Sequence, residues 1–130
     1  MKTAAPRILI LDDEKLIRWS LNQIFTQEGY EVDVAATMDE ALQLAGAKTY
    51  GLIFADLEIW FERGIAIFLD ILSRQKAAKI IIITAVTKGE AERSLGDVRP
   101  FAIVEKPFKS DEIKAVVKEA ITLTKRFLNE

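Results

Sequence analysis

Polar side chains of a few chemical types stand directly after four apolar runs of the sequence. RILIL is followed by Asp12 and Asp13, GLIFA by Asp56, KIIII by Thr84 and FAIVE by Lys106. Carboxylates, a hydroxyl and an amine brought to one place could bind a divalent cation and align a phosphoryl group. An ionised Asp56 could attack phosphorus without a general base, and the product would be an acyl phosphate.

The excess of negative charge among these residues favours a metal ion. Asp12, Asp13 and Asp56 outnumber Lys106 by about two charges, which a divalent cation would neutralise. The sequence contains neither His nor Cys, so its ligands are oxygens, and oxygen ligands favour Mg²⁺ over zinc or copper. Lys106 and the Thr84 hydroxyl would then contact the phosphoryl oxygens. A phosphohistidine donor would have to come from another protein.

The apolar runs predict the elements that position these residues. Each run is short and unbroken by polar residues, as in parallel strands buried on both faces, and such strands need helical crossovers. The pattern predicts strands at 7–11, 30–35, 51–55, 79–83 and 101–104, and helices at 14–27, from 37, at 64–74, at 89–95 and from 111. We therefore expect one three-layer α/β/α domain with five helices and a ligand site at the carboxyl edge of the sheet.

Two of the predicted helices carry informative local signals. Thr37 followed by Glu40 is typical of a capping box, in which two free amides at a helix start are satisfied. The segment 89–95 offers only Ala91 and Leu95 as apolar anchors, so we expect it to be loosely held and among the first parts to move.

Composition limits the classes of protein that the chain could be. A length of 130 residues with 50% hydrophobic content suits a single domain over 1–130. A net charge of -2 and a pI near 5.3 disfavour nucleic-acid and anionic-membrane binding. The start MKTAAPR lacks the apolar core of a signal peptide, and we find no linker to a second domain. These observations predict a cytoplasmic, single-module protein whose output is protein contact.

The chain resembles the receiver domains of two-component response regulators over nearly its whole length. The motifs that carry the resemblance are the acidic pair at 12–13, Asp56, Thr84 with Ala85, and Lys106-Pro107-Phe108, with Gly64 eight residues after Asp56. The stretch DDEKLIRWSL is further similar to receivers of sigma-54-dependent activators. The resemblance implies a flavodoxin-like sheet of order 2-1-3-4-5, as in the chemotaxis receiver.

The resemblance also implies roles for individual residues. Mg²⁺ would be held by Asp13, Asp56 and the backbone carbonyl of Glu58, with Asp12 acting through water, and the bond before Pro107 would be cis. Asp56 would take its phosphoryl group from a sensor histidine kinase or a phosphotransfer protein, the domain catalysing its own phosphorylation.

The expected consequence is a change in protein contacts through the fourth helix, the fifth strand and the fifth helix, read by a downstream protein target. The alternative is a receiver-fold interaction module that works independently of phosphorylation.

Two positions depart from the family pattern. Ile103 stands where receivers generally carry an aromatic switch residue. Phe101 lies two residues earlier, on the same face of the predicted strand, and is a candidate substitute. Trp60, followed by Phe61, stands where proline is usual.

Two apolar faces predict surface or packing roles. On the helix 64–74 we assign to the core Ile65, Phe68, Leu69 and Leu72. That assignment leaves Ile67 and Ile71 on the outer face of the helix, where they would form an exposed apolar patch with Trp60 and Phe61. The patch would serve as a homodimer or partner contact, or it would be incidental surface exposure. Trp19 is expected to pack against the last helix.

Two other classes share part of this pattern. A flavodoxin-type redox protein has the same topology, but DDEKL would repel an FMN phosphate. A dehalogenase-type phosphatase uses an aspartyl nucleophile, but in a D-x-D arrangement after the first strand, where this chain has D-D-E.

Overall fold

The structure, a computed structural model, describes residues 6–59 and 65–128. Its five strands form one parallel sheet of order β2-β1-β3-β4-β5, which confirms the predicted topology. The strands are β1 Ile8–Leu11, β2 Val32–Ala35, β3 Leu52–Asp56, β4 Lys79–Thr84 and β5 Ala102–Glu105. β3 and β4 continue through Asp56 and Thr84, so these two residues end strands rather than follow them.

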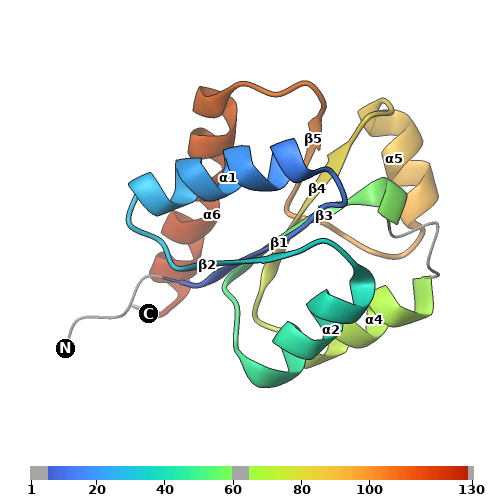
Figure 1. The fold of residues 1–130 in the computed structure, drawn as a ribbon, viewed down its shortest axis with the longest axis horizontal. Helices are drawn as coiled ribbons and strands as arrows, with labels where there is room; N and C mark the ends of the chain where they lie inside the picture. Colours follow the sequence, from blue (N-terminus) through green and yellow to red (C-terminus); the bar gives the residue numbers. More distant parts are fainter. Residues whose placement is uncertain (1–5, 60–64, 129–130) are drawn as a thin grey trace.

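Five helices of eight residues or more cover the two faces of the sheet (Figure 1). They are α1 Lys15–Gln27, α2 Met38–Ala47, α4 Ile65–Arg74, α5 Lys88–Leu95 and α6 Ser110–Leu128. A short helical turn at 57–59 directly follows β3. α1 and α6 lie on one face, while α2, α4 and α5 lie on the other, so the domain has the predicted three layers.

The core consists of two clusters, one on each face of the sheet. Leu21 and Phe25 of α1 pack with β-strand residues and with Ile113 and Val117 of α6. The other cluster contains buried residues of α2, α4 and α5. Side chains alternate along β1, with Ile8 and Ile10 in one cluster and Leu9 and Leu11 in the other. Burial on both faces explains why β1, β3 and β4 are nearly unbroken apolar runs, whereas the edge strand β2 is only partly buried and contains Asp33.

The predicted N-cap of α2, Thr37, is present. The Thr37 hydroxyl accepts a hydrogen bond from the Glu40 N–H at 3.2 Å, and the Glu40 carboxylate accepts one from the Ala36 N–H at 3.3 Å. The return bond thus reaches one residue before the cap. As predicted for α5, its buried residues are Ala91 and Leu95.

The orientation of α4 differs from the prediction. Ile71 is 1% exposed and Leu69 is 46% exposed, so the roles assigned to these two residues were wrong. Ile67, which was also assigned to the outside, is partly buried and packs against the core cluster. Phe68, Ile71 and Gln75 form the buried line, because α4 packs against α2 as well as against the sheet. The segment IAIFLDIL is apolar on nearly every side, so its periodicity could not orient it.

Trp19 also differs from its expected packing role. Its side chain is 59% exposed on α1, together with the exposed Leu16. Trp60, Phe61 and Gly64, which the sequence singled out, lie outside the described residues.

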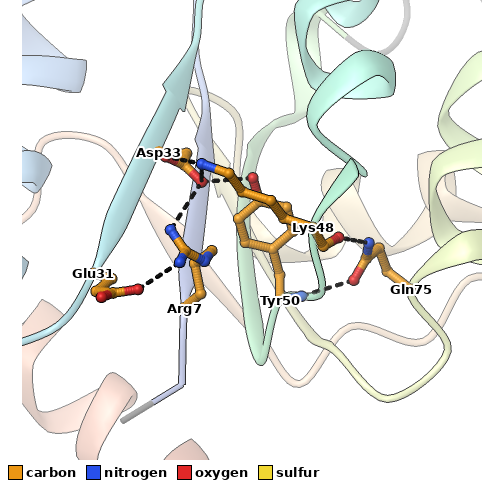
Figure 2. Close-up of polar contacts among 6 residues, drawn as sticks. All are labelled: Arg7, Glu31, Asp33, Lys48, Tyr50 and Gln75. Carbon is orange, nitrogen blue, oxygen red and sulfur yellow. Dashed lines mark hydrogen bonds and ion pairs between the residues drawn. The ribbon is translucent and has the colours of Figure 1, made fainter. Parts of the chain in front are cut away.

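A polar network closes the amino end of the sheet beside β1 and β2 (Figure 2). The Asp33 carboxylate accepts a hydrogen bond from the Tyr50 hydroxyl at 2.8 Å and is paired with Lys48 and Arg7. Burial alone would raise the pKa of Asp33, but the Tyr50 hydrogen bond and these cations outweigh burial and lower the pKa.

Gln75, at the end of α4, joins this network to the loop before β3. Its side chain accepts from the Tyr50 N–H at 2.8 Å and donates to the carbonyls of Ala45 and Lys48. A buried side chain thereby satisfies three backbone groups, one in the last turn of α2 and two in the loop after it. Among the described residues, no helix is long and apolar enough to cross a membrane.

Candidate functional site at the carboxyl edge of the sheet

The carboxyl ends of β1, β3, β4 and β5 bring the predicted site residues together. Asp12, one residue after β1, is held by a bond from its N–H to the Ala35 carbonyl of β2 at 3.2 Å. Asp12, Asp56 and Thr84 are fully buried, whereas Asp13 is exposed. Lys106, directly after β5, donates its N–H to the Thr84 carbonyl at 2.7 Å. The sheet therefore places all five polar side chains at one edge, as its parallel topology requires.

The Lys106 ammonium lies among three carboxylates. Its Nζ is 3.0 Å from Glu14 Oε1, 3.2 Å from Asp12 Oδ2 and 3.3 Å from Asp56 Oδ2. Burial alone would lower the pKa of Lys106, but the Glu14 hydrogen bond and the charges of Asp56 and Asp12 outweigh burial and raise it. Lys106 is therefore a permanent cation at neutral pH.

Asp12 is the carboxyl group of the site whose charged form is destabilised by its surroundings. Burial, reinforced by the charge of Asp56, raises its pKa to about 6, although the Glu14 N–H and Lys106 act in the opposite direction. Its Oδ1 accepts the Glu14 N–H at 2.8 Å. Its Oδ2 lies within ion-pair distance of Lys106 but without hydrogen-bond geometry, and it is the only buried side-chain polar atom in the described region that lacks a hydrogen bond.

Asp56 and Thr84 each make a short local contact that orients the side chain. Asp56 Oδ1 accepts the Glu58 N–H at 3.0 Å, which leaves Oδ2 facing Lys106. Thr84 Oγ1 accepts the Val86 N–H at 3.1 Å, so its hydroxyl proton can be donated elsewhere.

Two residues of the site were not identified as functional from the sequence. Glu14 makes the shortest contact with Lys106, and Arg18 donates to the Asp12 carbonyl at 2.9 Å. The available signal was helical spacing: Glu14 and Arg18 lie four residues apart at the start of α1, on one side of the helix that follows the acidic pair.

The acidic residues fit a hard divalent cation. Asp12, Asp13, Glu14 and Asp56 each offer an oxygen, and these oxygens lie within 4.8 Å of one another. The unsatisfied Asp12 Oδ2 is a buried carboxylate oxygen that a cation would satisfy. An all-oxygen donor set suits Mg²⁺ or Ca²⁺ rather than zinc.

The structure separates Ile103 from Phe101. Ile103 packs against the core cluster shared with α5, whereas Phe101 packs against the cluster shared with α1 and α6. The Phe101 ring also lies 5.5 Å from the Lys79 ammonium, at the amino end of β4 and away from the site. The expectation that the two residues share a strand face was therefore wrong, and Phe101 is not placed to substitute for a switch residue. The reason is that Phe101 precedes β5, where strand alternation does not apply.

This fold and this edge of acidic residues, hydroxyl and lysine define a receiver-like domain. The family model of the response regulator receiver domain matches residues 8–118, and the chain belongs to this family. The Lys106–Pro107 bond is cis, as the resemblance implied.

Two similar proteins agree with this assignment. The chain is 34% identical over 122 residues to sporulation initiation phosphotransferase F of Bacillus subtilis strain 168, covering 90% of this chain and 94% of that protein. It is 31% identical over 115 residues to transcriptional regulatory protein PmrA of Pectobacterium parmentieri, covering 88% of this chain but only 52% of that protein. The chain thus spans about half the length of that relative.

A solved structure of similar shape is the CheY-like receiver domain protein of Methanospirillum hungatei JF-1. It superposes with a TM-score of 0.84 at 26% identity, covering 95% of this chain and 98% of that chain. The likeness therefore extends over nearly the whole of both chains.

Proposed function

We propose that the chain is a phosphoacceptor switch whose acceptor is Asp56. The observation that carries the proposal is the buried Asp56 Oδ2 facing Lys106 Nζ at 3.3 Å, with Thr84 ending the neighbouring strand. A nucleophile, a fixed cation and a hydroxyl donor are the groups that transfer of a phosphoryl group to a carboxylate needs.

In the proposed reaction, an Asp56 carboxylate oxygen forms a bond to phosphorus. The P–N bond of a phosphohistidine on a kinase or phosphotransfer protein breaks, and its electron pair leaves with the imidazole, which takes up a proton. Lys106 would turn from Glu14 and Asp12 towards the phosphoryl oxygens, and Thr84 would donate its hydroxyl proton to one of them. Both groups would neutralise charge that develops in the transition state.

Asp12, Asp13 and Asp56 are proposed to hold Mg²⁺, with the Glu58 carbonyl as a further ligand and Glu14 close enough to assist. The cation would offset the charge that an incoming phosphoryl group adds to a site already rich in carboxylates.

The test is incubation with acetyl phosphate and Mg²⁺, followed by intact-mass measurement. We expect a gain of one phosphoryl group in the wild-type chain. Asp56→Asn should abolish the gain, and Asp97→Asn, which changes an exposed aspartate after α5, should retain it. Removal of Mg²⁺ by chelation should also abolish it.

Uptake by Asp56→Asn would place the acceptor elsewhere and refute the assignment. A folded wild-type chain that takes up nothing from acetyl phosphate or from a phosphorylated histidine protein would instead support the phosphorylation-independent interaction module.

A further inference from the structure

The last residue of β5 contacts the start of α5. Glu105 is the register partner of Thr84 at the end of the sheet. Its Oε1 accepts a hydrogen bond from the Lys88 N–H at 2.7 Å, across the loop that leaves β4. Lys88 is the first residue of α5, where backbone N–H groups have no partner within the helix and where the helix dipole favours a carboxylate.

Few apolar contacts hold α5 to the sheet. Only Ala91 and Leu95 are buried among its eight residues. Its remaining cap is local, because the Thr87 hydroxyl accepts the Glu90 N–H from within the same segment. Ile103, on the strand beneath, is an aliphatic side chain without a polar atom that could bond the loop. The Glu105 carboxylate thus supplies a short, charge-assisted hydrogen bond from the sheet to the first turn of the helix.

Glu105 is also a direct neighbour of Thr84 and Lys106, the two residues that a phosphoryl group on Asp56 would attract. Thr84 lies opposite it on β4, and Lys106 follows it in sequence and donates its N–H to the Thr84 carbonyl. A shift of Thr84 and its loop relative to β5 would stretch the bond between Glu105 and Lys88, since Lys88 is four residues beyond Thr84.

We propose that Glu105 is a positioning residue that fixes the first turn of α5 to β5 while Asp56 is unmodified, and that this bond is released when Asp56 carries a phosphoryl group. The proposal rests on the phosphoacceptor function proposed above. It identifies which bond connects the chemistry at Asp56 to the weakly packed helix.

The experiment measures amide hydrogen exchange at Lys88 by NMR, with and without beryllium fluoride and Mg²⁺ as a phosphoryl mimic. Without the mimic, Glu105→Ala should speed exchange at Lys88 by about ten-fold or more, the effect of losing a charge-assisted hydrogen bond. Glu105→Gln keeps an acceptor and should restore most of the protection. Glu92→Ala, which removes an exposed carboxylate from α5 itself, should leave Lys88 exchange at the wild-type rate.

With the mimic, wild-type Lys88 exchange should approach the Glu105→Ala rate, while Glu105→Ala itself should change little. Equal Lys88 exchange in wild type and Glu105→Ala without the mimic would overturn the positioning role. Acetyl phosphate uptake with Lys88 exchange unaffected by the mimic would overturn the release alone. Absence of both uptake and mimic binding would overturn the proposed function and the release together.

Discussion

Replacing Asp12 with asparagine should stabilise the metal-free protein at neutral and alkaline pH. Burial raises the pKa of Asp12 from 3.8 to about 6, so the folded state binds its proton more tightly than the unfolded state. The stability from that proton is fully present below about pH 4 and is lost as the pH rises through about 6. A shift of roughly two pKa units corresponds to about 3 kcal/mol of unfolding free energy. Asparagine is neutral at every pH and keeps an oxygen for the Glu14 N–H.

The assay is urea unfolding in the presence of a chelator between pH 4 and pH 8. At pH 8, Asp12→Asn should exceed wild type by about 3 kcal/mol, and the difference should shrink towards zero near pH 4. Asp13→Asn is the matched control, because Asp13 is exposed and lies next to Asp12. A stability difference that does not change with pH would show that the buried charge of Asp12 is not the cause. Mg²⁺ in place of the chelator should narrow the difference in unfolding free energy between Asp12→Asn and wild type, because it would stabilise the wild-type site.

Two further substitutions test what holds the scaffold. Gln75→Leu should lower the free energy of unfolding by about 2 to 4 kcal/mol in urea unfolding, because three backbone groups lose their partner, and an unchanged value would mean that water replaces the amide. Phe54→Ala should cost about 3 to 5 kcal/mol in the same assay, because its buried ring, 4.9 Å from that of Phe25, would leave a cavity; a loss below 1 kcal/mol would contradict this packing.

The strand ends were predictable because the sheet is buried on both faces. The sequence pattern placed all five strands to within two residues, and the polar residue after each of the four apolar runs identified Asp12, Asp56, Thr84 and Lys106. Parallel topology then required these residues to meet at one edge. The local sequence pattern sufficed for this part of the site, because each residue is marked by the apolar run that directly precedes it.

The contacts between elements were not predictable in the same way. The orientation of α4 depends on its packing against α2, and a helix that is apolar on most sides carries little information about that choice. Glu14 and Glu105 were overlooked for a related reason. Each is an exposed glutamate whose importance comes from a partner distant in sequence, Lys106 for Glu14 and the Lys88 amide for Glu105.

The polar network at the amino end of the sheet has a consequence for the register of its edge strand. Side chains alternate along a strand, so a slip of β2 by one residue would turn Asp33 to the opposite face of the sheet and break its bonds with Arg7, Lys48 and Tyr50. The same register sets Ala35 opposite Leu11, and the Ala35 carbonyl holds the Asp12 amide. The network therefore helps to align the site from the opposite end of the sheet, and substitutions that mispair β2 would displace Asp12 without touching any residue near it.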